Sequence, residues 1–118
     1  MASEILTRLL NYWNNKPSSQ IFARLGEELY KSGQRSRALE ILREGIEKYP
    51  GYITGYIVLA TCLFENDLID EAEITARMAN QLDPNNLVVL NLLADIAYRK
   101  RELETGLSYL DNILAIDP

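Results

Sequence analysis

The sequence predicts an all-α protein built as an α-solenoid, a stack of antiparallel helical hairpins with one extra N-terminal helix. Residues recur at a fixed step of 34 positions, and a proline closes each step: Pro50, Pro84 and Pro118. A period of this length is the signature of a repeat protein. Apolar residues follow helical spacing along the chain, and no useful stretch alternates with a period of two, so we expect no strands.

The N-terminal segment, residues 1–18, is predicted to be an amphipathic helix over residues 3–14. One apolar stripe runs along it, formed by Ile5, Leu6, Leu9, Leu10 and Trp13. Pro17 ends this helix and separates it from the next one. The segment lies outside the 34-residue register. It either caps the first hairpin or occupies a groove as a partner helix would, and we favour the cap.

Three helical hairpins are predicted to follow, in repeats that span residues 19–52, 53–86 and 87–118. Polar breaks at 32–34, 65–67 and 100–102 divide each hairpin into two helices. Short polar side chains at helix starts bond to free N–H groups, so Asp67 and Asn86 are predicted to cap the helices that follow them.

Small residues recur at the positions where two helices of a hairpin must approach closely. In the first helices they are Gly26, Ala60 and Ala94, and in the second helices Ala38, Ala72 and Gly106. A larger side chain at these positions forces the backbones apart and loses packing.

Composition excludes several classes of function. The chain has 118 residues and a formal net charge of -5, which argues against general affinity for nucleic acid. It has no histidine, so the commonest general base and the usual zinc ligand are missing. Phosphate-binding glycine loops, metal-spaced clusters and nucleophile motifs are absent as well. We therefore predict no enzyme activity, no catalytic residue, no metal and no cofactor.

Apolar stretches and cysteine content bear on location. No stretch approaches the roughly 18–20 apolar residues that span a bilayer, so no membrane insertion is expected. Residues 1–15 lack the layout of a secretory signal. The single cysteine, Cys62, lies in an apolar run and is expected to be a buried, inert thiol. We expect a soluble, cytoplasmic protein.

The repeated residues resemble the tetratricopeptide repeat over residues 19–118. The first copy reads Phe22, Leu25, Gly26, Leu29, Ala38, Leu42, Gly45, Pro50. The second copy reads Tyr56, Leu59, Ala60, Leu63, Ala72, Ala76, Ala79, Pro84. The third copy reads Leu90, Leu93, Ala94, Ala97, Gly106, Leu110, Ile113, Pro118. Departures from the pattern are Ala76 and Ala97, which are small where it prefers a large residue, and Ile113, which is large where it prefers alanine.

The resemblance implies a right-handed superhelix whose concave face is lined by the first helix of each pair. Members of this family usually bind peptides or partner helices there and act as scaffolds or adaptors. Those that grip the carboxylate of heat-shock chaperones use basic residues and asparagines. The matching positions here are Ala23, Glu27, Val58, Val88 and Leu92, so that specificity is not expected.

Helical geometry identifies the face of the first helices that lies opposite the core. In the three repeats it consists of Gln20, Ala23, Glu27, Tyr30 and Lys31, of Thr54, Ile57, Thr61, Phe64 and Glu65, and of Val88, Asn91, Asp95, Tyr98 and Arg99. Tyr30, Phe64 and Tyr98 form an aromatic column there. Either this column offers apolar anchors to a bound peptide, or its rings are ordinary scaffold packed between adjacent helices.

The predicted function is a non-catalytic protein-interaction scaffold that binds a peptide or partner helix in the concave groove. Two alternatives stay open. One is a regulatory or targeting segment of a larger enzyme or assembly factor whose other domains lie beyond residue 118. The other is a self-associating module, because the last helix has no cap and the N-terminal helix has an apolar stripe. Residues 1–50 have a formal net charge of +2 and residues 51–118 one of -7. This uneven charge fits a solvated surface, steering of a basic partner towards the second half, or head-to-tail association.

Overall fold

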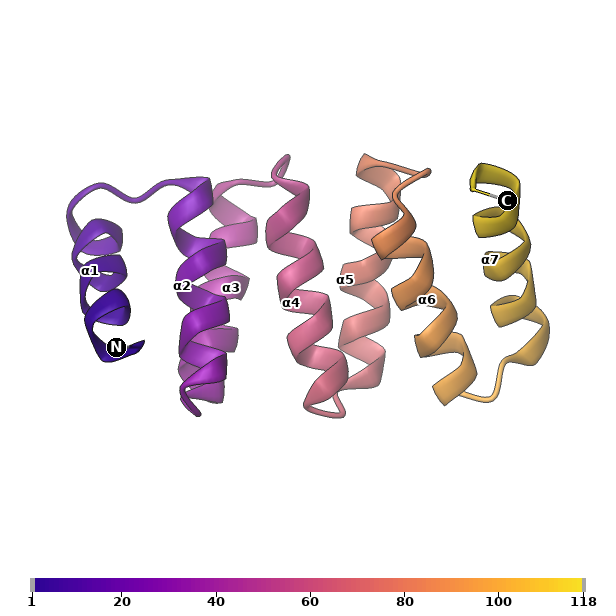
Figure 1. The fold of residues 1–118 in the computed structure, drawn as a ribbon, viewed down its shortest axis with the longest axis horizontal. Coiled ribbons are helices and arrows are strands. Elements are labelled where there is room, and N and C mark those ends of the chain that lie inside the picture. The colour runs from indigo at the N-terminus through magenta and orange to yellow at the C-terminus, as the bar shows by residue number, and fades with distance from the viewer. Residues whose placement is uncertain (1, 118) are drawn as a thin grey trace.

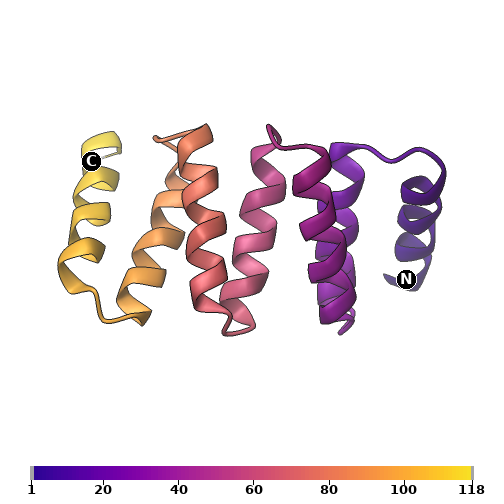
Figure 2. The ribbon, with the colours of Figure 1, turned by 180° about the vertical axis from the view of Figure 1, so that it is seen from behind.

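The computed structural model describes the backbone of residues 2–117 and the side chains of residues 4–117, and this part of the chain is all helical. Its helices are α1 (Ala2–Asn15), α2 (Ser19–Lys31), α3 (Arg35–Lys48), α4 (Ile53–Glu65), α5 (Ile69–Leu82), α6 (Leu87–Arg99) and α7 (Leu103–Ile116). They follow one another along the long axis of a rod of 45 × 25 × 25 Å (Figure 1). The opposite view shows the same order (Figure 2). The predicted α-solenoid is confirmed.

Short polar residues set the starts of two first helices. The backbone N–H of Ile21 donates to Ser18 Oγ at 3.3 Å, so Ser18 caps α2. The N–H of Val89 donates to Asn86 Oδ1 at 3.1 Å, which confirms the predicted cap of α6. Pro118, the predicted closing proline of the third copy, lies outside the described residues.

The turn inside each hairpin has the same backbone conformation. Gly33, Asp67 and Arg101, 34 residues apart, have positive φ angles of 90°, 64° and 62°. In each turn the next residue donates its N–H to a carbonyl five positions earlier, as in the bond of 2.9 Å from Leu68 to Leu63. This is the Schellman ending, which requires one left-handed residue after the helix.

The prediction that Asp67 caps α5 is therefore wrong. Leu68 precedes α5 and makes no side-chain cap bond. Asp67 supplies the left-handed residue of the turn instead, a conformation that aspartate tolerates better than most residues. Its carboxylate accepts a hydrogen bond of 2.6 Å from Arg99 Nη2, which links two neighbouring hairpins.

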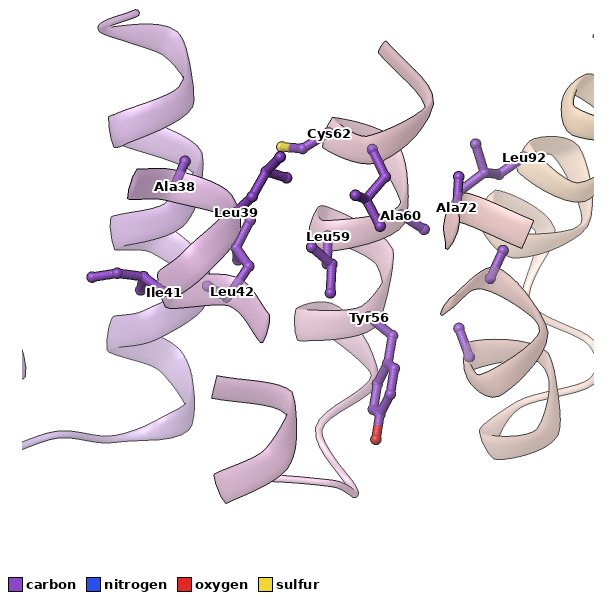
Figure 3. Close-up of a cluster of buried hydrophobic side chains, with 14 of the residues drawn as sticks. Ala38, Leu39, Ile41, Leu42, Tyr56, Leu59, Ala60, Cys62, Ala72 and Leu92 are labelled. Carbon is purple, nitrogen blue, oxygen red and sulfur yellow. The ribbon is translucent and has the colours of Figure 1, made fainter. Parts of the chain in front are cut away.

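The core runs along the rod between the first and second helices. Ala38, Ala60 and Ala72 have no exposed surface, and they lie where helices cross closely. Figure 3 shows these alanines with larger buried side chains of α3, α4 and α6 around them. A Cβ added to Gly26 would overlap Leu42 of α3. Small residues thus set the distance between the helices of each hairpin.

The first helices form one face of the rod. α2 contacts α4 and α4 contacts α6, whereas each second helix contacts the first helix that follows it. Ion pairs connect the second helix α5 to both neighbouring repeats. Arg43 donates two hydrogen bonds of 2.7 Å to Glu71, and Lys100 Nζ donates one of 2.9 Å to Glu73.

The two ends of the rod differ in how they are covered. α1 packs on α2, and the Trp13 ring lies 6.3 Å from that of Phe22, so α1 covers the first hairpin as favoured above. On α7, Leu103 and Leu114 are each 59% exposed and Leu107 is 51% exposed. Within the described chain, that apolar face of α7 has no helix against it.

Phe22 is one of the fully buried side chains of the first hairpin. It has no exposed surface, and its ring stacks on Tyr49 at 5.8 Å with the planes 7° apart. Two glycines of neighbouring helices make room for it. A Cβ added at Gly45 of α3 or at Gly55 of α4 would overlap the Phe22 ring.

We expect Gly45→Ala to lower the free energy of unfolding, measured by urea denaturation. Replacing a helical glycine by alanine gains about 0.5–1 kcal/mol, but overpacking a ring that cannot move costs typically about 1–3 kcal/mol. The expected net loss is about 1 kcal/mol. Gly51→Ala is the control, because an added Cβ there meets no atom within 4 Å. A Gly45→Ala protein as stable as the parent would show that Phe22 is not tightly enclosed.

Candidate functional site

A cavity of about 200 Å³ lies between α2 and α4, on the face formed by the first helices. Its lining comes from Glu27, Tyr30 and Lys31 of α2 and from Ile57, Val58, Thr61, Cys62 and Glu65 of α4. Six of these side chains are among the predicted groove residues. Helical phase does not predict the other two, Val58 and Cys62, and Val58 appears only as a position that matches the carboxylate-gripping residues of the resembled family. Their spacing of four along α4 is the signal that could have found them, because it places them on one side of the helix.

The floor of the cavity is apolar because α4 is apolar on nearly all sides. Val58 is half-buried, and Cys62 is only 5% exposed. Burial, with smaller contributions from Glu65 and Glu27, raises the pKa of the Cys62 thiol to about 12. The Thr61 hydroxyl donates to the Ile57 carbonyl at 2.8 Å, so its proton is already used within α4.

Tyr30 forms the wall of the cavity on α2. The residue is half-buried, and its Oη is a buried atom with no hydrogen-bond partner in the described structure. Burial raises the pKa of the phenol, Arg35 opposes that shift, and the Glu65 carboxylate adds to it. The Arg35 guanidinium lies 5.2 Å from the centre of the Tyr30 ring. Tyr30 thus combines a covered ring with an unsatisfied hydroxyl.

Charged groups stand around the cavity. Lys31 Nζ lies 3.6 Å from Glu27 Oε1, in a pair whose side chains are 65% and 43% exposed. Such exposed pairs are weak because water screens them. Glu65 is exposed, and no ion pair to it is seen among the described side chains. The lining therefore contains two carboxylates and one ammonium group.

A second hollow of about 160 Å³ begins beside the first, nearer the N-terminal ends of α2 and α4. It contains the predicted residues Gln20, Ala23, Glu27 and Thr54. Ala23 is only 4% exposed and belongs to the core as much as to this surface. Glu27 and Val58 border both hollows, so the two lie next to each other along the α2–α4 contact, and together we call them the groove.

The predicted residues of α6 are arranged differently. Val88, Asn91 and Asp95 are exposed on its surface, and the Asn91 amide donates to the Leu87 carbonyl at 2.9 Å. Arg99 lies 5.7 Å from the centre of the Phe64 ring while it bonds to Asp67.

The predicted aromatic column therefore has three different environments. Tyr30 lines the α2–α4 cavity. Phe64 is partly buried beneath Arg99. Tyr98 is 74% exposed and borders a shallow hollow with Arg101 and Leu103.

The described residues contain neither a cluster of metal ligands nor a helix that could span a membrane. No group of three or more acidic, histidine or cysteine side chains among them is arranged to hold a metal ion. None of the described helices has both the length and the apolar character of a membrane span.

Comparison with known proteins identifies the type of repeat. The family described as "Tetratricopeptide repeat" matches residues 29–96, more than half of the chain. No curated protein sequence matches the chain.

Solved structures share the fold at low sequence identity. One is the protein MamA, residues 41 to the end, from Desulfovibrio magneticus RS-1, with a TM-score of 0.87 and 18% identity over 98% of this chain and 66% of that chain. Another is YrrB, with a TM-score of 0.86 and 22% identity over 100% of this chain and 61% of that chain. A third is the first repeat domain of Spaghetti (RPAP3), with a TM-score of 0.79 and 16% identity over 85% of this chain and 79% of that chain. The chain thus spans less than two thirds of the length of the first two of these.

We expect Tyr30→Phe to raise the free energy of unfolding by about 1 kcal/mol, because a buried hydroxyl without a partner costs about 1–3 kcal/mol. Urea denaturation measures the change. Tyr98→Phe is the matched control, since the Tyr98 side chain is 74% exposed and its hydroxyl is solvated. A loss of stability in Tyr30→Phe would mean that the hydroxyl is hydrogen-bonded in the folded protein.

We expect the Cys62 thiol to react with a disulfide reagent at pH 8 at least about a hundredfold more slowly in the folded chain than in urea, since only the thiolate reacts. The folded pKa of about 12 exceeds the ordinary value of 9.0. Ionisation therefore favours the unfolded chain, and the contribution of the thiol to stability is complete below pH 9 and declines as the pH rises towards 12. Equal rates in the two states would contradict the burial of Cys62.

Proposed function

The chain belongs to the tetratricopeptide repeat family, and from that premise we propose that it is a non-catalytic protein-interaction module. It holds a peptide or a partner helix against the face formed by α2, α4 and α6. The groove along the α2–α4 contact is the main part of this binding surface.

One observation carries the proposal. Glu27, Tyr30, Lys31, Ile57, Thr61 and Glu65 come from two helices 34 residues apart in the sequence, and they line a single cavity. The cavity combines an apolar floor with a few polar groups, which is the usual composition of a ligand site. Half-buried aromatic and aliphatic side chains offer contact area, and the carboxylates offer orientation.

Two of the similar structures support a peptide as the ligand class. YrrB is described as a repeat protein with an unusual peptide-binding site. The RPAP3 domain is bound to the HSP90 peptide SRMEEVD. These descriptions concern those proteins, and at identities of 22% and 16% the likeness to this chain is one of fold.

The charges in the groove of this chain disfavour an acidic peptide such as SRMEEVD. Glu27 and Glu65 line the α2–α4 cavity, so a carboxylate entering it would meet two negative charges. Like charges brought together in a partly desolvated interface suppress binding. This electrostatic argument agrees with the expectation from sequence that a chaperone carboxylate is not the ligand.

We expect Thr61→Trp to block the groove, because an indole in the middle of the α4 wall fills the cavity. Peptides are first selected on the parent protein from a random 12-residue display library, and their affinities are then measured by calorimetry. The expected loss is at least about tenfold, as for the blocking of a central contact.

Thr105→Trp is the matched control, since Thr105 is exposed on α7, away from the first-helix face. Circular dichroism of both variants checks that the fold is kept. Peptides that bind Thr61→Trp as tightly as they bind the parent would place the binding surface elsewhere.

A further inference from the structure

The two gaps between successive first helices can be compared position by position. In the gap between α4 and α6, the Arg99 guanidinium lies 5.7 Å from the centre of the Phe64 ring. Its Nη2 also donates a bond of 2.6 Å to Asp67 in the neighbouring turn. This gap is therefore spanned by a cation that lies on an aromatic ring and is bonded to a carboxylate. Such a contact combines cation–π attraction with a charge-assisted hydrogen bond.

The gap between α2 and α4 has the same backbone arrangement, but the residue that corresponds to Arg99 is acidic. Thirty-four residues before Arg99 stands Glu65, and the counterparts of Phe64 and Asp67 are Tyr30 and Gly33. No guanidinium of α4 can cross this gap, and the space is the cavity of about 200 Å³. A carboxylate takes the place that a cation fills one repeat later.

The lining of the cavity is complementary to a cation with an apolar stem. Glu65 stands at its edge without an ion pair among the described side chains, and Glu27 is held only by its exposed pair with Lys31. Tyr30 Oη is buried without a donor. Ile57, Val58 and Cys62 provide apolar surface beneath these groups.

Two cations also belong to this neighbourhood and limit what can bind. Lys31 lines the cavity, and Arg35 lies against the Tyr30 ring. Neither is placed as Arg99 is, because Lys31 pairs with Glu27 on its own helix and Arg35 begins α3. Lys31 lines the same cavity, so its positive charge opposes the entry of a second cation and acts as a competitor.

We propose that the α2–α4 cavity binds an arginine side chain of a peptide ligand, with its guanidinium on Glu65 and Tyr30 and its methylene stem on Ile57, Val58 and Cys62. This inference rests on the proposed function and specifies its ligand. Arginine fits better than lysine because its planar group bonds to a carboxylate through two parallel N–H groups and stacks on an aromatic ring. The internal counterpart, Arg99 on Phe64, shows the same chemistry within the chain.

The test is a titration of the full chain, labelled with ¹⁵N, followed by amide NMR spectra. The probes are the N-acetyl, N′-methylamide derivatives of arginine, lysine, norleucine and glutamate. Only the arginine derivative is expected to shift the amide signals of residues 57–65 and 27–31 strongly, with the lysine derivative weaker by about threefold or more. Equal affinity for lysine would overturn the arginine assignment, and equal affinity for norleucine would overturn a cation site altogether.

Variants then assign the contact to its residues. Glu65→Gln keeps the shape of the side chain and is expected to lower the affinity for the arginine derivative about tenfold. Glu104→Gln on α7 is the control and is expected to leave this affinity unchanged. Lys31→Met removes the competitor and is expected to strengthen binding about two- to fivefold. An unchanged affinity in both Glu65→Gln and Lys31→Met would sink the proposal.

The outcome is distinguishable from failure of the proposed function. Library peptides that lack arginine but lose affinity in Thr61→Trp would keep the groove as a binding surface and refute its arginine pocket. Library peptides whose affinity is unaffected by Thr61→Trp would instead refute the groove itself.

Discussion

The close contact between the two helices of each hairpin is the constraint on which the rest of the structure depends. Alanine or glycine stands at each crossing, as at Ala38 and Ala72, and a Cβ at Gly26 would already overlap Leu42. Because this contact recurs every 34 residues, each hairpin sits on the next in the same way. Residues 34 positions apart therefore face equivalent gaps on the first-helix face. The groove is a consequence of core packing rather than a separately built site.

Most of the fold could be predicted because its signals are local. Prolines, short polar breaks and apolar stripes specified every helix to within a residue or two, and Asn86 caps α6 as expected. Asp67 was assigned the wrong role because an aspartate before a helix signals a cap. It signals a left-handed turn residue only when the preceding helix is considered as well. The decisive interaction, its bond to Arg99 of the next hairpin, joins residues 32 positions apart and leaves no local trace.

The sequence predicted which helix face carries the candidate site, but it did not predict how deeply each residue of that face is buried. Helical phase placed Glu27, Tyr30, Ile57 and Thr61 on one face, and they do line one cavity. Phase failed for Val58 and Cys62 because α4 is apolar on nearly all sides, so its sequence does not mark which residues face the groove. Helical phase also placed Ala23 and Tyr98 on this face without distinguishing how exposed each side chain is. Ala23 is small enough for its neighbours to cover, whereas Tyr98 protrudes from α6 and is 74% exposed.

Polar groups are satisfied unequally on the two sides of the rod. Around the second helix α5, Arg43 and Lys100 bond to Glu71 and Glu73 and lower the pKa of both carboxyls. On the first-helix face, Tyr30 Oη is buried without a partner, at a cost of about 1–3 kcal/mol for such a group. The other unsatisfied buried atom in the described structure, Asn80 Oδ1, belongs to a residue that borders a hollow of about 380 Å³ beside α7, which has room for several waters. Within the first-helix face, the gap between α4 and α6 already holds the Arg99 guanidinium, and the gap between α2 and α4 does not. The α2–α4 gap, where Tyr30 Oη lacks a partner and Glu65 lacks an ion pair among the described side chains, is therefore the one to which we assign the proposed arginine side chain.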